Sequence, residues 1–308
     1  MKIICFDNLL RVIISLVPLV VTAQEEIRFT NKATYTKIGD MNITKFVSLL
    51  PAPVTNEYQE ITDLKATKGS FIVLNEANKV LYYEGAFGND SVFETCETFR
   101  YKTKKIKIDF SNKSDRNIVT GINPESYLLS DGYYIDTANA VIKYIGTRLW
   151  NESSNILEYA ERCYQYVATH CEYINGDGRP LAEIFRIGGG VCCDFTTLFV
   201  NLMVYKGIPA RHNWGVLVNG EYHVWPDFYH EDYGWIPVDP TFKHAHPEED
   251  YFGRYDGGMI IMSQGLTTFI KSDVHASDIA LQKCFCWYWY NSGSGTINAR
   301  HEGSKIMN

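Results

Sequence analysis

The sequence predicts an α+β protein whose first part is built of strands and whose second part combines helices with an antiparallel meander. Residues 24–125 hold short alternating segments separated by turn residues, which is typical of an all-β sandwich. Residues 126–308 begin with apolar residues at helical spacing and continue with strand-like segments. We therefore expect an N-terminal β-sandwich domain at 24–125 and a second domain at 126–308 that includes the C-terminal strands.

Residues 1–23 have the pattern of a secretory signal peptide. Lys2 and Arg11 precede an apolar run at 12–21, and the segment 21–23, Val-Thr-Ala, has small residues at the cleavage positions. The run is too short to span a bilayer. Cleavage there would leave a secreted or periplasmic protein without a stable membrane anchor. The formal net charge of −7 and the lack of a dense basic tract argue against a nucleic-acid partner.

The strand prediction for the N-terminal domain rests on three alternating segments at 71–74, 80–83 and 101–110. In the third segment, lysines alternate in part with apolar residues, which indicates a solvated face rather than a binding patch. A polar stretch at 111–123 is expected to link this domain to the second.

Three helices are predicted in the second domain, at 137–150, 154–170 and 192–206. The third has apolar residues at helical spacing, and Gly207 and Pro209 follow it as a stop signal. The first two are expected to pack against the third.

A meander of three strands is expected after these helices, at 211–218, 221–229 and 235–239. Asn219-Gly220 is the signal of a two-residue hairpin turn between the first two strands. Pro226 removes a ladder donor from the second strand and predicts that this strand lies at an edge.

Two apolar runs follow the meander, at 259–262 and 284–290. The aromatic-rich second run is expected to be a strand held between layers, and binding of a sugar or peptide is the alternative explanation of its aromatics. Positions after Ser292 are expected to be loosely ordered.

A thiol, an imidazole and a carboxylate occur in order in this region, as Cys192, His223 and Asp239. Cys192 opens a predicted helix, where unpaired N–H groups and the helix dipole favour an anion, and thiols so placed can have a pKa well below about 8.5. If the second and third strands of the meander pair around position 231, His223 and Asp239 face each other with Cβ atoms about 4.5–5.5 Å apart. Asp239 would then orient the imidazole toward Cys192.

Each of these residues also has an ordinary structural explanation. A cysteine at a helix start is often a small buried hydrophobe, a histidine on a strand is often a hydrogen-bonded framework residue, and Asp before Pro often forms a turn. Thiol chemistry needs a nucleophile, a base that can take and return a proton, and a group that orients the base. The joint context of the three residues favours such a triad.

These motifs resemble those of the transglutaminase-like superfamily, and in particular its exported bacterial members and cysteine proteases. The superfamily pattern consists of G-x-C-x-D, G-I-P-A-R, H-x-W, and G-W followed by Asp-Pro-Thr. The matching positions are Gly190, Cys192 and Asp194, then 207–211, His223 and Trp225, and finally Gly234, Trp235 and 239–241. The resemblance covers roughly residues 137–242. In addition, the segment 50–59 resembles the L-P-x-P…Y-Q stretch of the β domain that precedes many bacterial cores of this kind.

This resemblance implies a papain-like core in which helices pack on an antiparallel sheet. It implies that Cys192 is the nucleophile, His223 the general base and acid, and Asp239 the orienting carboxylate. Cys193 falls on a variable position of the pattern and is given no catalytic role. Many members carry Glu at the position of Asp227, so the site entrance is expected to differ here.

Tyr173, Trp225 and Gly190 are the candidate substrate-binding residues. Tyr173 is expected to wall the cleft, with core packing as the alternative. The Cys192 backbone N–H is the natural first oxyanion donor, and Tyr173 or a tryptophan is a candidate for the second. The glycine run at 188–190 fits either a close backbone approach to a substrate or a flexible loop.

Seven cysteines remain after the signal segment, and an odd number in an oxidising compartment leaves at least one thiol unpaired. The candidate pairs are Cys163 with Cys171 and Cys284 with Cys286. A bridge between Cys192 and Cys193 is not expected.

The sequence predicts no metal site and no cofactor. None of the cysteine spacings matches a zinc site, and no acidic alternating calcium loop is visible. His244 and His246 are expected to be surface residues because no further ligands stand near them.

The predicted function is thiol-dependent acyl transfer at an amide or peptide carbonyl, with hydrolysis by a cysteine peptidase or amidase as the favoured outcome. The expected substrate is a peptide or protein amide. Two alternatives remain: cross-linking of protein glutamine by a transglutaminase, and a non-catalytic glycan- or peptide-binding protein on the same fold.

Overall fold

The computed structural model describes residues 27–112, 123–217, 221–265, 267–271, 274, 276–281, 285–291 and 295–306. The predicted signal peptide at 1–23, the Asn219-Gly220 turn and most of the predicted linker at 111–123 lie outside these ranges. Within the described ranges, none of the helices has the length and apolar character needed to cross a membrane.

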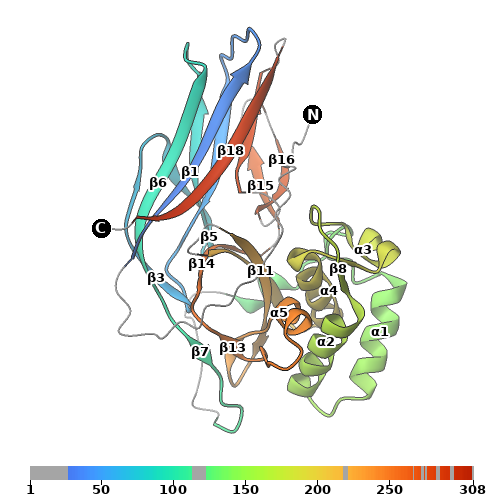
Figure 1. The fold of residues 1–308 in the computed structure, drawn as a ribbon. Helices are drawn as coiled ribbons and strands as arrows, with labels where there is room; N and C mark the ends of the chain where they lie inside the picture. The colour runs from blue at the N-terminus through green and yellow to red at the C-terminus, as the bar shows by residue number, and fades with distance from the viewer. Residues whose placement is uncertain are drawn as a thin grey trace.

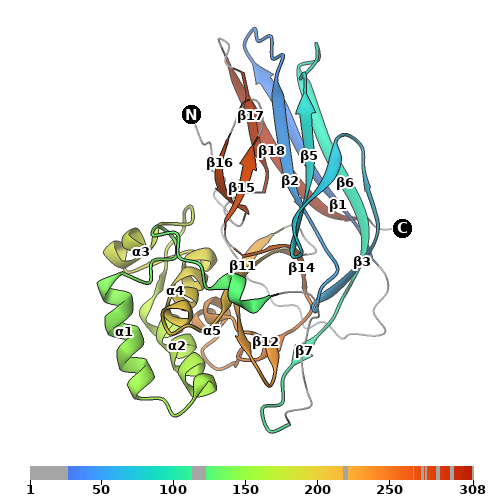
Figure 2. The ribbon, with the colours of Figure 1, turned by 180° about the vertical axis from the view of Figure 1, so that it is seen from behind.

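Two four-stranded antiparallel sheets form a β-sandwich (Figures 1 and 2). Their strand orders are β18-β1-β6-β3 and β17-β2-β5-β4. The strands are β1 Ile27–Ile38, β2 Phe46–Ala52, β3 Gln59–Ala66, β4 Ser70–Asn75, β5 Asn78–Gly85, β6 Val92–Thr103, β17 Trp287–Tyr290 and β18 Thr296–Ile306. Tyr35, Phe46 and Phe93 point inward and pack edge to face or tilted between the sheets. The predicted N-terminal sandwich is therefore confirmed.

The C-terminal strands belong to this sandwich and not to the second domain. β18 pairs with β1 from Arg28 opposite Ile306 to Ile38 opposite Thr296, and β17 pairs with β2 (Figure 1, red beside blue). β17 is an edge strand of its sheet, yet apolar residues pack on both of its faces, as predicted: Tyr288 and Tyr290 contact the sandwich core, and Trp287 and Trp289 contact a cluster that includes Ile279. The assignment of all of 126–308 to one domain and the loose order after Ser292 were thus wrong. Alternation along a strand shows its buried face but not which distant strand it joins.

Helices and a further four-stranded sheet form the middle of the chain (Figure 1). We call this sheet, which lies outside the sandwich, the second sheet. The helices are α1 Ala140–Asn151, α2 Ile156–His170, α3 Leu181–Ile187, α4 Cys192–Tyr205 and α5 Pro240–Ala245. The sheet has the order β12-β11-β10-β14, with β10 Ala210–Leu217, β11 Tyr222–His230, β12 Gly234–Pro237 and β14 Met259–Gln264. Every residue of α4 from Cys192 to Val204 is buried, so this helix lies at the centre of the unit between the other helices and the sheet.

Short elements complete the described chain. They are β7 Ile106–Lys107, η1 Pro124–Tyr127, β8 Glu172–Tyr173, β9 Gly189–Gly190, β13 Arg254–Tyr255, β15 Thr267–Lys271 and β16 Ala276–Ala280. β8 and β9 pair in parallel, β7 pairs with β13, and β15 pairs with β16. The strand predicted at 101–110 is therefore divided between the end of β6 and β7.

The register of the second sheet differs from the predicted one. Asp227 lies opposite Pro237 and His230 opposite Gly234, so the pairing centres on position 232 rather than 231. Each residue of β11 therefore faces a partner two positions later in the chain than predicted. Because side chains alternate with a period of two, that partner still points to the predicted face of the sheet. The ladder between β11 and β12 ends at Pro237, and Asp239 lies beyond it.

Pro226 does not mark an edge strand, because β11 lies between β10 and β12. Pro226 stands just outside the last pair of the β11–β12 ladder, and its carbonyl accepts a hydrogen bond from the Val238 backbone N–H at 3.0 Å. The missing donor thus falls where the neighbouring strand is already leaving the sheet, and this is why a proline is tolerated there.

Buried polar side chains join the sandwich to the second sheet. The Gln59 amide pairs with the backbone of Ile261 in both directions, at 2.8 Å each, and Asn78 does the same with Gln264, at 2.7 and 2.9 Å. One apolar cluster also contains Phe29 of the sandwich together with residues of α4 and of the second sheet. The two units therefore share a continuous buried interface.

Candidate active site

The N-terminus of α4 carries Cys192, whose residue is only 5% exposed. The turn before it is held by Asp194, a fully buried carboxylate. Asp194 accepts hydrogen bonds from the Val191 backbone N–H at 3.0 Å and from the Arg179 guanidinium at 2.9 Å, both on Oδ2. Its Oδ1 accepts a third from the Arg179 backbone N–H at 2.7 Å. A buried carboxylate with three charge-assisted bonds fixes the backbone that presents the thiol.

The glycines before α4 are explained by close packing within the protein. A Cβ atom on Gly190 would lie 2.1 Å from Oδ2 of Asp194, and one on Gly189 would lie 2.1 Å from the carbonyl oxygen of Glu172. Gly188 has a φ of 78° and ends α3 in the left-handed region. The close approach predicted from the glycine run is real, but it is an approach to β8 and to Asp194. A substrate contact of Gly190 through its backbone stays a prediction.

His223 and Asp239 meet as the sequence predicted, by a route that it did not predict. The His223 Nε2 lies 2.7 Å from the Asp239 Oδ2, and both residues are buried, at 6% and 5% exposure. Asp239 is the N-cap of α5, and its Oδ1 accepts a hydrogen bond from the Phe242 backbone N–H at 2.9 Å. The carboxylate therefore serves as helix cap and as histidine partner at once, which matches the Asp-Pro start of a helix.

The surroundings of His223 favour its protonated form. Burial acts to lower the pKa of His223, but the Asp239 carboxylate, its hydrogen bond and a hydrogen bond with Cys192 outweigh burial and raise this pKa to about 10. With Nε2 turned to Asp239, Nδ1 is the nitrogen left for the thiol. The structure thus brings Cys192, His223 and Asp239 into one chain of contacts.

Tyr173 and Trp225 lie in different environments. Tyr173 on β8 is 37% exposed, and burial together with the nearby Cys192 and Asp194 raises its pKa to about 12. Tyr173 is thus open to solvent and near enough to Cys192 and Asp194 to be affected by their charges, and its role as a cleft wall stays a prediction. Trp225 is only 2% exposed and packs in a buried cluster with Tyr58, so it is a framework residue in this structure.

A buried charged cluster that the sequence did not predict joins β10 and β11 to the segment before β3. Arg211 on β10 forms ion pairs with Asp227 at 3.0 Å and with Glu57, and its guanidinium stacks 3.9 Å from the centroid of the Trp235 ring. The Tyr58 hydroxyl donates to Asp227 Oδ1 at 2.6 Å. Burial is the largest influence on the pKa of Asp227 and raises it to about 6, although the positive charge of Arg211 acts to lower it.

The signals for this cluster were present but incomplete in the sequence. Arg211 belongs to the G-I-P-A-R segment, and Asp227 follows two residues after Trp225 of the H-x-W motif. Their partners Glu57 and Tyr58 come from the preceding domain, more than 150 positions away in the chain. Asp227 therefore holds the interface between the two units and does not line a site entrance.

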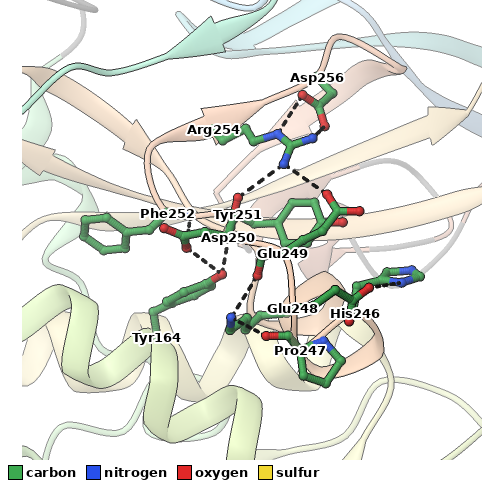
Figure 3. A network of polar contacts seen from close by, with 11 residues as sticks. Tyr164, His246, Pro247, Glu248, Glu249, Asp250, Tyr251, Phe252, Arg254 and Asp256 are labelled. Carbon is green, nitrogen blue, oxygen red and sulfur yellow. Dashed lines mark hydrogen bonds and ion pairs between the residues drawn. The ribbon is translucent and has the colours of Figure 1, made fainter. Parts of the chain in front are cut away.

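The segment after α5 is fastened by a polar network (Figure 3). The Tyr164 hydroxyl of α2 contacts Asp250 Oδ1 at 3.3 Å and accepts from the Tyr251 backbone N–H at 2.9 Å. Arg254 contacts Glu249 at 3.1 Å and Asp256 at 2.8 Å. The chain beyond the Asp239 carboxylate is thereby tied to α2.

No disulfide joins any two of the described cysteines, which are Cys96, Cys163, Cys171, Cys192, Cys193 and Cys286. Neither the candidate bridge between Cys163 and Cys171 nor one between Cys192 and Cys193 is formed, and Cys284 lies outside the described residues. Burial raises the pKa of Cys171 to about 12, helped by Asp194 and Glu172.

The two histidines near α5 are half-buried rather than fully at the surface. His244 Nδ1 lies 2.9 Å from the Ala168 carbonyl oxygen and its ring packs against Phe195, while His246 lies 3.9 Å from Glu248. Among the described residues, no three potential metal ligands come together in one group.

Comparison with known proteins adds independent support. Residues 143–240 match the family model of the Transglutaminase-like superfamily. A solved structure from Cytophaga hutchinsonii, named "Putative Cysteine Protease", superposes with a TM-score of 0.61 at 14% identity over 92% of both chains. At this identity the likeness establishes the fold.

Two further matches add less. An uncharacterized protein of Haemophilus influenzae is 22% identical over 237 residues, which is 62% of this chain and 62% of the length of that relative. The periplasmic domain of TgpA from Pseudomonas aeruginosa covers 72% of this chain and 90% of its own at 12% identity, with a TM-score of 0.38 that is too low to establish a shared fold. Residues 143–240 thus match the model of the transglutaminase-like superfamily, and the chain as a whole has the fold of the Cytophaga hutchinsonii structure.

Proposed function

We propose that this protein is a thiol-dependent acyl-transfer enzyme acting on peptide or protein amides. The observation that carries the proposal is the contact chain Cys192, His223, Asp239, with 2.7 Å between the imidazole and the carboxylate. A thiol paired with a basic imidazole that a carboxylate orients is an arrangement that activates a nucleophile.

In the proposed reaction the Cys192 thiolate attacks the amide carbonyl and forms a tetrahedral intermediate. The imidazolium of His223 protonates the departing amine as the C–N bond breaks, which leaves a thioester. Water then attacks the thioester while neutral His223 accepts its proton, and the acid is released with the thiol regenerated. Asp239 keeps Nε2 bonded throughout, so Nδ1 serves both proton transfers.

The acceptor of the acyl group decides between hydrolysis and cross-linking. We propose hydrolysis, because water outcompetes amines in dilute solution unless the site excludes it. Transamidation of protein glutamine is the alternative outcome of the same thioester. A non-catalytic binding protein would have no need for a buried, mutually bonded cysteine, histidine and aspartate.

Mass spectrometry separates these outcomes. Glutamine-containing peptides are incubated with the protein in the presence and absence of a primary amine, with the Cys192→Ala variant as control. Cleaved or deamidated products that require Cys192 support hydrolysis, and amine adducts support cross-linking. No product from either reaction, together with no rapid alkylation of Cys192 at mildly acidic pH, would rule out the enzyme.

We also propose that the protein is exported to the periplasm or the medium. The support is the basic, apolar and small-residue pattern of residues 1–23. Sequencing the N-terminus of protein recovered from the expressing cell tests this, since export with processing predicts a mature chain that begins after Ala23. A cytoplasmic chain that retains Met1 would contradict it.

A further inference from the structure

The imidazole of His223 lies in a row of nearly parallel aromatic rings. Its ring centroid is 4.5 Å from that of Phe242, with 7° between the planes, and 6.0 Å from that of Trp225, with 13° between the planes. Trp225 in turn lies 5.6 Å from Tyr255, at 15°. A histidine ring stacked in this way has little freedom to rotate about its Cβ–Cγ bond.

Phe242 is bound to the same carboxylate as the imidazole that it covers. Its backbone N–H donates to Asp239 Oδ1 at 2.9 Å, while Oδ2 of Asp239 faces His223 Nε2 at 2.7 Å. Ring and carboxylate therefore approach the imidazole from one short segment at the start of α5. A change in the position of this segment would alter the stacking and the hydrogen bond together.

The far end of the row is formed by the other unit of the protein. The Tyr58 ring packs edge to face on Tyr255, with 4.9 Å between centroids and 79° between planes. Tyr58 is fully buried, and its hydroxyl donates to Asp227 at 2.6 Å. Tyr58 precedes β3 of the sandwich, so the row runs from the sandwich to the histidine.

We propose that Phe242, Trp225, Tyr255 and Tyr58 are positioning residues that fix the plane of the His223 imidazole, and that the sandwich thereby helps to build the active site. The inference rests on the proposed function, because it concerns the same histidine. A fixed plane keeps Nε2 on Asp239 and Nδ1 on Cys192. The ring face of Phe242 also stabilises the protonated imidazole, since a cation over an aromatic face is attracted to it.

The row predicts a specific effect on thiol reactivity. Asp239 and Cys192 are the titratable groups that act on the imidazole. When the imidazolium is less favoured or turned away, Cys192 loses its cationic partner and its sulfur reacts more slowly at acidic pH. The acid limb of the alkylation profile should then move to higher pH.

The test measures the rate of Cys192 alkylation by iodoacetamide between pH 4 and 9, with peptide mapping to identify the site. Phe242→Leu keeps the backbone bond to Asp239 and removes only the ring, and we expect about tenfold slower alkylation at pH 6, equivalent to a shift of about one pH unit. Phe242→Tyr restores a ring and should stay within about twofold of the wild type. Phe110→Leu is the matched control, because Phe110 is a partly buried ring whose closest ring contacts are Tyr233 and Phe252.

The sandwich end of the row is tested by a second pair. Tyr58→Leu should shift the profile in the same direction as Phe242→Leu, whereas Tyr58→Phe keeps the ring and should shift it less. A wild-type profile in Phe242→Leu, or an equal loss in Phe110→Leu, would overturn the inference while the proposed function stands. Slow alkylation of Cys192 in the wild type itself would overturn both.

Discussion

Replacement of Gly190 by alanine tests how the nucleophile is held in place. The added Cβ would lie 2.1 Å from Asp194 Oδ2, whereas ordinary contacts of this kind begin at 3.4 Å, so the carboxylate must retreat by roughly 1 Å. Such a movement breaks the bonds of Oδ2 to Val191 at 3.0 Å and to Arg179 at 2.9 Å. Two buried bonds to a charged group are worth about 3–6 kcal/mol together. We expect Gly190→Ala to lose about that much of its free energy of unfolding.

Urea unfolding followed by fluorescence measures this loss, and Gly188→Ala supplies the control. Gly188 has a φ of 78°, and a Cβ added there would meet open space, so its replacement costs only about 1–2 kcal/mol of backbone strain. Gly190→Ala should also slow alkylation of Cys192, because the first turn of α4 moves, while Gly188→Ala should not. A Gly190→Ala protein within about 1 kcal/mol of the wild type, with unchanged alkylation, would refute the packing explanation.

Three further changes have defined outcomes. Asp239→Asn removes the main stabiliser of the His223 imidazolium, so the pKa of about 10 falls, the alkaline limb of activity moves to lower pH, and turnover drops by about 10²-fold or more in a pH–rate assay. Burial raises the pKa of Glu97 to about 8 from its usual 4.5, so this group favours folding below pH 4.5 and loses that contribution as pH rises through 8. Glu97→Gln should therefore gain about 4 kcal/mol over the wild type at pH 8 and almost nothing at pH 4.5, by urea unfolding at both pH values, and an equal effect at both would contradict it. Asp227→Leu leaves the buried Arg211 with one carboxylate fewer and should cost about 3–5 kcal/mol, part of which Arg211→Met in the same chain should restore.

Local sequence signals were sufficient for the helix that carries the thiol. Apolar spacing and the stop signal at Gly207 and Pro209 predicted a helix at 192–206, and α4 spans Cys192–Tyr205. The prediction that Asp239 is the partner of His223 was correct, but the structural reason for their contact differs from the predicted one. Asp239 contacts the imidazole from the N-cap of α5 and not from a paired strand. The predicted register was wrong by two residues in the partner strand, and the two side chains were still assigned to the same face because side chains of a strand alternate with a period of two.

Long-range pairing could not be read from the sequence. The pattern of the segment at 284–290 predicts a strand, and β17 is one, but its partner β2 lies more than 200 positions earlier in the chain. In the same way Trp225 occurs in a motif next to His223, yet whether it faces solvent depends on Tyr255 and Tyr58, which other parts of the fold bring to it. Spacing identifies residues that share a face, and tertiary packing decides what covers that face.

The middle unit is inserted between the strands of the sandwich, and we expect that it does not fold as a separate domain. Its strand β14 pairs with the side chain of Gln59, and its buried Arg211 is neutralised in part by Glu57. A fragment limited to residues 123–265 would keep Cys192, His223 and Asp239 but would lose both partners and expose the apolar face that packs on the sandwich. Because a buried charge without its partner costs several kcal/mol, comparable to the whole stability of a small domain, we expect this fragment to be unfolded by circular dichroism. A fragment that folds cooperatively and is alkylated at Cys192 as fast as the whole chain would show that the sandwich is dispensable for the site.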